Sequence, residues 1–340
     1  MEAGGRRAEH WRTSAHGRAR DGSTLGAMAV SALSESSCHR PADADTAPWE
    51  PGYAVRWRHA DTRFAVGDWA CPGIAHGAPS VGADEEEIPA QIEINLQRCG
   101  WHLRSVAGRD YLIDPNGASL WPNDAGYRLS HNRGRPQAAT LMFVAPEAFE
   151  SALSDVPGSG RASLPRLLGS PSVLRSDRVA LAHAELLASK QRLDVEERSL
   201  ALLRHIVTDA LDTRARSKPA SAREISRIVR GCAYIAAHYR EDLSIEAIAS
   251  AAGMSPSRFS TRFPDVVGMS VWRHVTMLRL RMALQAIADD DDHDLTALAF
   301  RLGFSSHSHF TARFRAQYGR TPSALRAALR RLRHASDKGP

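Results

Sequence analysis

Two stretches near the C-terminus decide the fold of this 340-residue chain: SIEAIASAAGMSPSRFSTRFPDVVG (Ser244–Gly268) and DLTALAFRLGFSSHSHFTARFRAQYG (Asp294–Gly319). Each begins with a side chain whose oxygen can cap a helix start, and an apolar i, i+3, i+4 pattern follows. Each then passes a glycine, restarts at a serine, carries two phenylalanines four residues apart and ends at a second glycine. This order predicts a helix, a tight turn and a second helix, and it occurs twice.

The turn inside each copy has its own sequence signals. Gly253 and Gly303 stand where the first helix must end, at positions that favour positive φ. Ser255 then precedes a proline, which is typical of a helix that begins with a serine cap. In the second copy Ser305 or Ser306 takes the same place. Both copies are therefore expected to form helix-turn-helix units, and two adjacent units indicate a protein that holds DNA in two neighbouring grooves.

The charge distribution supports DNA binding at this end of the chain. Residues 221–340 hold 18 Lys and Arg against 11 Asp and Glu, a net charge of +7. The whole chain holds 44 Lys and Arg and 38 Asp and Glu, so residues 1–220 hold 26 basic and 27 acidic residues, a net charge of −1. A positive excess confined to the repeats is what the neutralisation of phosphates requires. The acidic run at 289–292 would repel phosphate, so we expect it in a turn that faces away from DNA.

The region from about 225 to 329 resembles the DNA-binding domain of the AraC/XylS family of bacterial transcription regulators. The resemblance rests on motifs in both copies and in the segment between them, and it covers roughly a third of the chain. It implies two recognition helices joined by one long helix, at about 271–288, that sets their separation. The matching residues are Leu243–Ile245, Ile248–Ala249, Gly253–Pro256, Gly268–Ser270, Arg279–Leu280, Ala283, Ile287–Ala299, Leu302–Ser305, His309–Phe310, Phe314, Tyr318–Gly319, Thr321–Ser323 and Arg326.

The chain departs from the family pattern in both expected recognition helices. Arg262 and Arg313 lie one place later than the arginine that the family commonly has, where this chain carries Thr261 and Ala312. At about 100° per residue, this shift moves each arginine to the flank of its helix. We therefore interpret both arginines as phosphate contacts. Recognition is expected to depend on backbone contacts and DNA shape more than on pairing of arginine with guanine.

The same helical geometry, together with the resemblance, assigns the side chains that would meet DNA. Those expected to face base edges are Ser257, Ser260, Thr261, His307, Ser308, Thr311, Ala312 and Arg315. Those expected at phosphates are Ser255, Arg258, Arg262, Ser305, Ser306 and Arg313. Serine and threonine discriminate bases weakly, and alanine can contact only a thymine methyl. The alternative for each small polar residue is a merely solvated helix position.

Residues from about 53 to 149 show short alternating runs, such as Gln91–Leu96, separated by turn residues. Many short strands at close spacing predict a small antiparallel barrel or sandwich. Segments 108–115 and 127–131 resemble the cupin-like sensor domain of many AraC-type regulators, which implies a small-molecule effector. His131 is the candidate for an effector contact, with a hydrogen-bonded structural role as its alternative. The scattered histidines do not form the His-x-His pattern of a catalytic cupin, so no metal is expected.

A helical segment is expected between the barrel and the repeats. In its second half Leu200, Leu203, Val207 and Ala210 or Leu211 fall near heptad spacing. In the family, helices after the barrel commonly form dimers, so we expect a homodimer through this stripe. The alternative is that the same stripe packs on the chain's own barrel.

The domain boundaries follow from these patterns and from composition. Residues 1–48 are rich in Arg, Gly, Ser and Pro and predict a disordered tail, with Met28 as an alternative start to Met1. The expected divisions are 1–48 tail, 49–160 sensor domain, 161–213 helical dimerisation segment, 214–222 linker, 223–332 DNA-binding domain and 333–340 tail.

The expected fold class is therefore α+β with two domains: an N-terminal cupin-like antiparallel β-barrel with trailing helices, and a C-terminal all-α tandem helix-turn-helix domain. The expected function is a sequence-specific transcription regulator of the AraC/XylS type, an activator rather than an enzyme, without a cofactor. Its expected partners are double-stranded DNA, RNA polymerase, a small-molecule effector and a second copy, with no membrane. The four cysteines show no metal spacing and no disulfide framework, which favours the cytoplasm.

Two alternatives come from other classes of protein. One is a constitutive DNA-binding regulator whose barrel only dimerises. The other is a cupin-type enzyme fused to a DNA-binding domain, against which the missing metal-ligand pattern argues.

Overall fold

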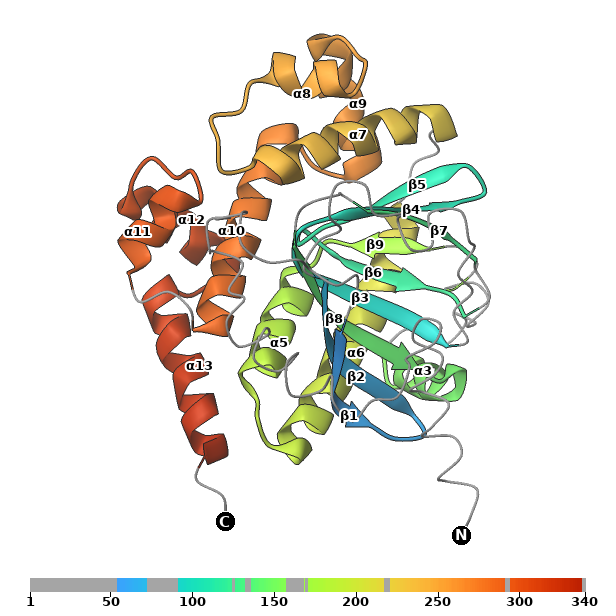
Figure 1. Cartoon of the computed structure of the whole chain (residues 1–340), viewed down its shortest axis with the longest axis vertical. Coiled ribbons are helices and arrows are strands. Elements are labelled where there is room, and N and C mark those ends of the chain that lie inside the picture. Colours follow the sequence, from blue (N-terminus) through green and yellow to red (C-terminus); the bar gives the residue numbers. More distant parts are fainter. Residues whose placement is uncertain are drawn as a thin grey trace, which may run out of the picture.

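The computed structural model of the protein describes residues 54–71, 91–123, 126–131, 136–156, 168, 171–216, 221–290 and 294–337. The expected N-terminal tail at 1–48 lies outside these residues, and so does the middle of the expected linker. Within them, strands occupy the first half of the chain and the repeats form helices in the second half (Figure 1). This combination of antiparallel sheet and helices confirms the expected α+β class.

The strands form two sheets. One has six strands in the order β1-β2-β8-β3-β6-β9, and the other has three in the order β5-β4-β7. Every pairing between described strands is antiparallel, as the alternating sequence predicts. The strands are β1 Ala54–Ala60, β2 Phe64–Cys71, β3 Ile92–Cys99, β4 His102–Val106, β5 Arg109–Ile113, β6 Ala118–Trp121, β7 Arg128–His131, β8 Gln137–Val144 and β9 Ser172–Leu174.

The last strand corrects one expectation. Residues 161–213 were expected to be helical, but Ser172–Leu174 form β9 at the edge of the six-stranded sheet. There Leu174 lies opposite Ala118 of β6 and is buried. A short apolar segment can satisfy its backbone groups at a sheet edge as well as in a helix, so its local sequence does not decide between them.

Three helices cover one face of the six-stranded sheet: α3 Pro146–Ser154, α5 Asp177–Ala188 and α6 Arg192–Arg216. In α6, Leu203 and Val207 are fully buried in one apolar cluster with Phe64 and Ile94 of the sheet. The stripe expected to form a dimer interface therefore packs on the chain's own sheet, which was the alternative. These buried side chains are therefore not available to a second copy. Heptad spacing alone does not distinguish a stripe that packs on its own sheet from one that forms a dimer.

From Asp177 onwards, every described helix or strand is a helix. The two repeats form the pairs α8–α9 and α11–α12, and α10 runs between them (Figure 1). The joining helix expected at 271–288 is confirmed to within one residue. The helices are α7 Ala222–His238, α8 Ile245–Ala251, α9 Pro256–Val267, α10 Val271–Asp289, α11 Leu295–Arg301, α12 His307–Tyr318 and α13 Pro322–Asp337.

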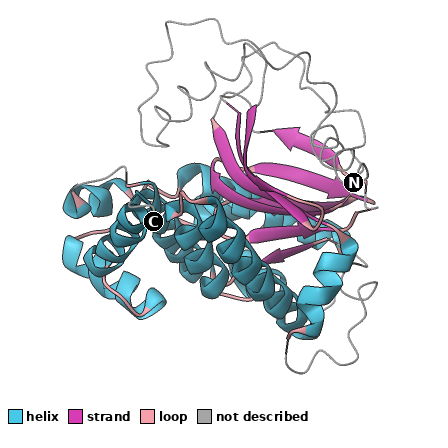
Figure 2. Ribbon diagram, turned by 90° about the horizontal axis from the view of Figure 1, so that it is seen from below, coloured by secondary structure: helices cyan, strands magenta, loops and turns pink. Residues whose placement is uncertain are grey.

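The helical half packs directly on the sheet half. Leu112 of β5 and Ala184 of α5 belong to the same apolar cluster as Ile228 of α7 and Leu278 of α10. From below, the helices gather on one side of the sheets (Figure 2). The two halves therefore share one continuous core, and burial of its apolar side chains stabilises their mutual position.

The acidic run after α10 takes part in this packing. Asp289 accepts a hydrogen bond from Arg98 of β3 at 2.7 Å, and Asp290 pairs with Arg330 of α13 at 2.8 Å. These two carboxylates are thus engaged in ion pairs within the chain. The rest of the run lies outside the described residues, so its orientation away from DNA stays a prediction.

Candidate nucleic-acid interface

The first helix of each unit begins at the expected cap. The Ser244 hydroxyl accepts the Ala247 N–H at 3.2 Å, and Asp294 Oδ1 accepts the Thr296 N–H at 2.8 Å. A side-chain oxygen at this position satisfies an amide that the helix itself leaves without a partner. The equivalent caps confirm that the two copies are built on the same plan.

The turn and the second cap also follow the expectation. Gly253 and Gly303 have φ values of 63° and 81°, in the left-handed region that glycine enters without strain. Ser255 caps α9 by accepting the Arg258 N–H, and Ser306 caps α12 by accepting the His309 N–H at 3.1 Å. Of the two serines expected as the cap of this helix, Ser306 is therefore the one that caps it.

Each recognition helix is held by its phenylalanines. Phe259 and Phe263 of α9 and Phe310 and Phe314 of α12 are completely buried. The ring centroids within each pair lie 5.3 Å and 5.7 Å apart, a range favourable for aromatic contact. Because these rings anchor one side of each helix in the core, the opposite side faces solvent.

The residues expected to face base edges lie on that outer side. Seven of them are exposed: Ser257, Ser260, Thr261, His307, Ser308, Ala312 and Arg315. Thr311 is half-buried, and its hydroxyl lies 3.5 Å from His307 Nε2. The Thr261 hydroxyl donates a hydrogen bond to the Ser257 carbonyl at 2.9 Å, so in this arrangement it can only accept a hydrogen bond from a base.

Among the residues expected at phosphates, Arg262 is a correction. Its guanidinium donates to both carboxylate oxygens of Glu224, at 2.7 Å each, and to Asp265 at 2.8 Å. The hydrogen bond from Arg262 holds the pKa of Glu224 below its usual range, and pairing with Glu224 raises the pKa of Arg262. The fork that would grip a phosphate is thus occupied by carboxylates, and Arg262 links α9 to α7 instead.

The other residues expected at phosphates are placed as the sequence suggests. Arg258 and Arg313 are exposed on α9 and α12. Arg313 Nε lies 3.2 Å from His309 Nε2, and His309 Nδ1 lies 3.3 Å from the Ser305 hydroxyl. His309 therefore connects Ser305 and Arg313 along one flank of α12, where a phosphate could meet both.

Arg279 on α10 connects the segment after α7 to the second unit, a role that the sequence patterns did not indicate. Its guanidinium donates to the carbonyls of Tyr239 and Gly303 at 2.7 Å each, and to that of Glu241 at 2.9 Å. Two of these carbonyls follow α7 and the third lies in the turn of the second unit. Burial lowers the pKa of Arg279, but the three carbonyl partners compensate for its lost hydration.

Gly231 on α7 is a second residue whose role was missed. A Cβ at this position would lie 2.5 Å from Cζ of Phe259, which is closer than real contacts allow. The absent side chain lets α7 approach the anchor of the first recognition helix. A glycine inside a helical pattern was the available signal, since such a glycine often has a packing reason.

The sheet half also touches the second recognition helix. Asp177, at the start of α5, accepts hydrogen bonds from Arg281 of α10 at 2.8 Å and from Gln317 of α12. The Arg281 guanidinium lies over the ring of Tyr318, 5.7 Å from its centroid. Burial raises the pKa of Tyr318 to about 12. The inner side of α12 is therefore fixed to α5.

Other expected sites are less defined by the structure. His131 ends β7 opposite His102, and its side chain lies outside the described residues. In the described part of the chain, no group of three or more His, Cys, Asp or Glu side chains could hold a metal ion. Of the helices described, none is long and apolar enough to cross a bilayer.

Comparison with known proteins identifies the helical half. Residues 248–328 match the model of a helix-turn-helix domain family. The regulatory protein PocR of Salmonella typhimurium is 32% identical over 109 residues, which are 32% of this chain and 36% of PocR. The transcriptional activator RhaS of Escherichia fergusonii is 31% identical over 94 residues, 28% of this chain and 34% of RhaS.

A solved structure is similar over part of the chain. It is a transcriptional regulator of Chromobacterium violaceum described as having an AraC-type DNA-binding domain, 25% identical over 30% of this chain and 91% of that one, with a TM-score of 0.29. The chain spans about a third of the length of the curated relatives named above. The two capped units and the joining helix agree with the family match, and residues 248–328 form a helix-turn-helix domain.

Proposed function

We propose that this protein is a sequence-specific DNA-binding regulator of transcription, and that it acts as an activator in the cytoplasm rather than as an enzyme. In this proposal α9 and α12 enter successive segments of the major groove on one face of the DNA, and α10 fixes their separation. RNA polymerase and a second copy of the chain are further partners. The second copy needs a surface other than the α6 stripe, because that stripe is buried.

The observation that carries the proposal is the duplicated recognition helix. Both helices bury two phenylalanines and expose small polar side chains on the opposite side. Only a surface that is free of intramolecular contacts can read base edges, and both copies have one. Of the relatives named above, RhaS is a transcriptional activator and PocR a regulatory protein, which favours the same function.

Response to a small-molecule effector is part of the proposal, and a polar cluster between the two sheets supports it. Glu93 of β3 and Arg104 of β4 form an ion pair at 2.6 Å, and both side chains are almost completely buried. Tyr127 donates to Glu93 at 3.2 Å, and Arg104 lies over the ring of Trp121. A buried ion pair contributes little to stability, whereas a few convergent polar groups among aromatic rings can orient a ligand.

The proposal is tested by selecting duplexes from a random library with the full chain and measuring binding by gel shift. Ser308→Ala and Arg315→Ala should each weaken binding to the selected site, whereas Arg331→Ala, at an exposed position of α13, should not. Unchanged binding by both α12 variants would refute the assignment of base contacts. Failure of the wild-type protein to enrich any duplex would refute DNA recognition itself.

Effector response is tested separately by thermal shift of the protein with a metabolite panel. A ligand that raises the melting temperature of the wild type, but not that of Glu93→Gln, would support a site at the polar cluster. The constitutive alternative is favoured if no ligand changes the melting temperature.

A further inference from the structure

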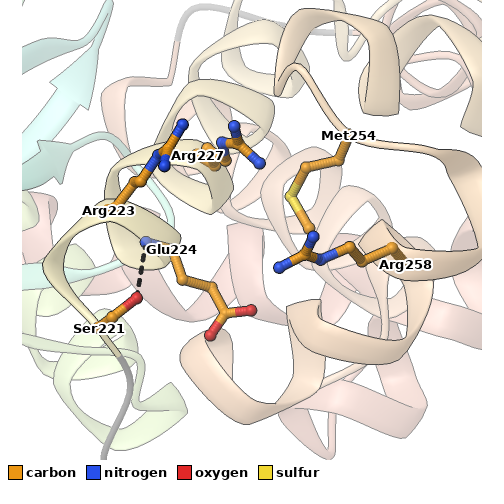
Figure 3. A pocket seen from close by; sticks show the side chains of 6 residues that line it. All are labelled: Ser221, Arg223, Glu224, Arg227, Met254 and Arg258. Atoms are coloured by element: carbon orange, nitrogen blue, oxygen red, sulfur yellow. Dashed lines mark hydrogen bonds between the residues drawn. The ribbon is translucent and has the colours of Figure 1, made fainter.

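A pocket beside the first recognition helix has no role in the function proposed above. It lies between the start of α7 and the turn that joins α8 to α9, and its volume is about 340 Å³ (Figure 3). The residues that line it are Ser221, Arg223, Glu224, Arg227, Met254 and Arg258. Three of these six side chains are arginines, which is unusual for a pocket that serves only packing.

The positive charge of this pocket is only partly neutralised by the described residues. Glu224 is the one carboxylate in the lining, and it is already bound by Arg262 from outside the pocket through two hydrogen bonds of 2.7 Å. No described side chain forms an ion pair with Arg223, Arg227 or Arg258. The lining therefore carries three guanidinium groups against one carboxylate, a net charge of +2.

The backbone adds to the attraction for an anion. The pocket opens at the N-terminal end of α7, a helix of 17 residues capped by Ser221. The free amides and the dipole of a helix start favour negative charge. In Figure 3, Arg227 from α7 and Arg258 from α9 converge on the same space, with Met254 at its rim. Arginine is suited to this role, because its planar fork matches the oxygens of a phosphate.

The position of the pocket indicates which phosphate would reach it. Arg258 is the residue next to Ser257, which faces the bases in the proposed function, so the pocket flanks the reading side of α9. We propose that the pocket binds a phosphate of the DNA backbone beside the half-site read by α9. This assignment rests on the proposed function and extends it: α7, through Arg223 and Arg227, becomes part of the DNA interface.

The test is the salt dependence of DNA binding by the full chain. Fluorescence anisotropy is measured over a range of KCl concentrations with a duplex selected by the protein and with an unrelated duplex of equal length. Arg227→Gln, alone and with Arg223→Gln, is compared with the wild type. The control is Arg192→Gln, which removes one charge at the exposed start of α6.

Each lost phosphate contact should reduce the magnitude of the slope of log affinity against log salt by about 0.9. When the salt concentration rises fourfold, the variant should therefore lose about 3.5-fold less affinity than the wild type loses. Both duplexes should be affected equally, because phosphate contacts carry no sequence information. The control should keep the wild-type slope, and so should Arg227→Lys, which retains the charge. The melting temperature of each variant shows whether it is folded. If Arg227→Gln is not folded, Arg223→Gln alone, at an exposed position of the same pocket, is compared with the wild type.

A wild-type slope in the folded glutamine variants would overturn the assignment while leaving the proposed function intact. A second arm titrates inorganic phosphate into the DNA-free protein by calorimetry. Saturable binding that is lost in Arg227→Gln would overturn the DNA assignment in favour of a free phosphorylated ligand, and absence of binding supports the DNA backbone. Failure of the wild type to bind either duplex would overturn the proposed function as well.

Discussion

Replacement of Asp114 by asparagine is expected to stabilise the protein at neutral pH. Asp114 lies in the turn between β5 and β6 and is 1% exposed. Its Oδ1 accepts the Asn116 N–H at 3.1 Å, but Oδ2 has no hydrogen-bond partner among the described residues. Burial raises the pKa of this carboxyl to about 6 from 3.8, in spite of the attraction of Arg175. The charged form is therefore disfavoured in the folded state.

The magnitude follows from the difference between the folded and unfolded pKa values. The shift of about 2.2 units corresponds to about 3 kcal/mol at 1.36 kcal/mol per unit. Because the folded pKa is raised, the contribution of this group to stability is complete below about pH 4 and is lost as the pH rises through 6. Asp114→Asn keeps the acceptor for Asn116 and removes the titration. The variant should therefore match the wild type near pH 4 and exceed it by about 3 kcal/mol above pH 7.

The measurement is urea unfolding of the full chain at several pH values, with the m-values compared to confirm that the same surface unfolds. Asp242→Asn is the control, because it removes a carboxylate at an exposed position, where substitutions typically change stability by less than about 0.5 kcal/mol. If Asp114→Asn is no more stable than the wild type at pH 7, with equal m-values, the argument from desolvation is wrong. A gain that does not depend on pH would refute it equally.

Three further outcomes are expected. Gly231→Ala should lower the free energy of unfolding by about 1–3 kcal/mol, because the new methyl group would overlap the buried ring of Phe259. If urea unfolding shows the variant to be more stable than the wild type, α7 can move away from the ring and the argument is wrong. Asp177→Ala should lower the urea midpoint, because it leaves the buried Arg281 without its carboxylate. It should cost more than Glu196→Ala, which removes the partner of the exposed Arg63, and equal effects would contradict this. Burial lowers the pKa of His274 to about 3 from 6.5, so the contribution of the neutral ring to stability is lost as the pH falls below 6.5. At pH 5 the free energy of unfolding should be lower by about 2 kcal/mol for this reason. His274→Gln should therefore lose less stability than the wild type between pH 7 and 5, and parallel curves would refute the assignment.

The helix-turn-helix units could be predicted from sequence because their signals are local. Ser244, Asp294 and the two turn glycines act within four residues of their own positions, and the structure confirms each of them. The joining helix at about 271–288 was expected from the family resemblance, and α10 confirms it. Features of this kind are fixed by backbone chemistry before any tertiary contact forms.

The features that were missed or wrong depend on residues far apart in the chain. The helical wheel places Arg262 on the flank of α9, but it does not reveal that Glu224, 38 residues earlier, stands opposite. Strand register also depends on residues far apart in the chain, since Phe64 of β2 lies opposite Val144 of β8. The spacing of the α6 stripe was recognised correctly, but an apolar stripe does not specify which surface covers it.

The three hydrogen bonds of Arg279 have a consequence for the architecture of the target DNA. They join the end of α7 to the turn of the second unit, so the two recognition helices cannot pivot about α10 without breaking them. Insertion of one base pair between the half-sites displaces one of them by about 3.4 Å and rotates it by about 35° around the duplex axis. We expect this protein to tolerate little variation in the phase of its half-sites, and that intolerance should relax in Arg279→Gln.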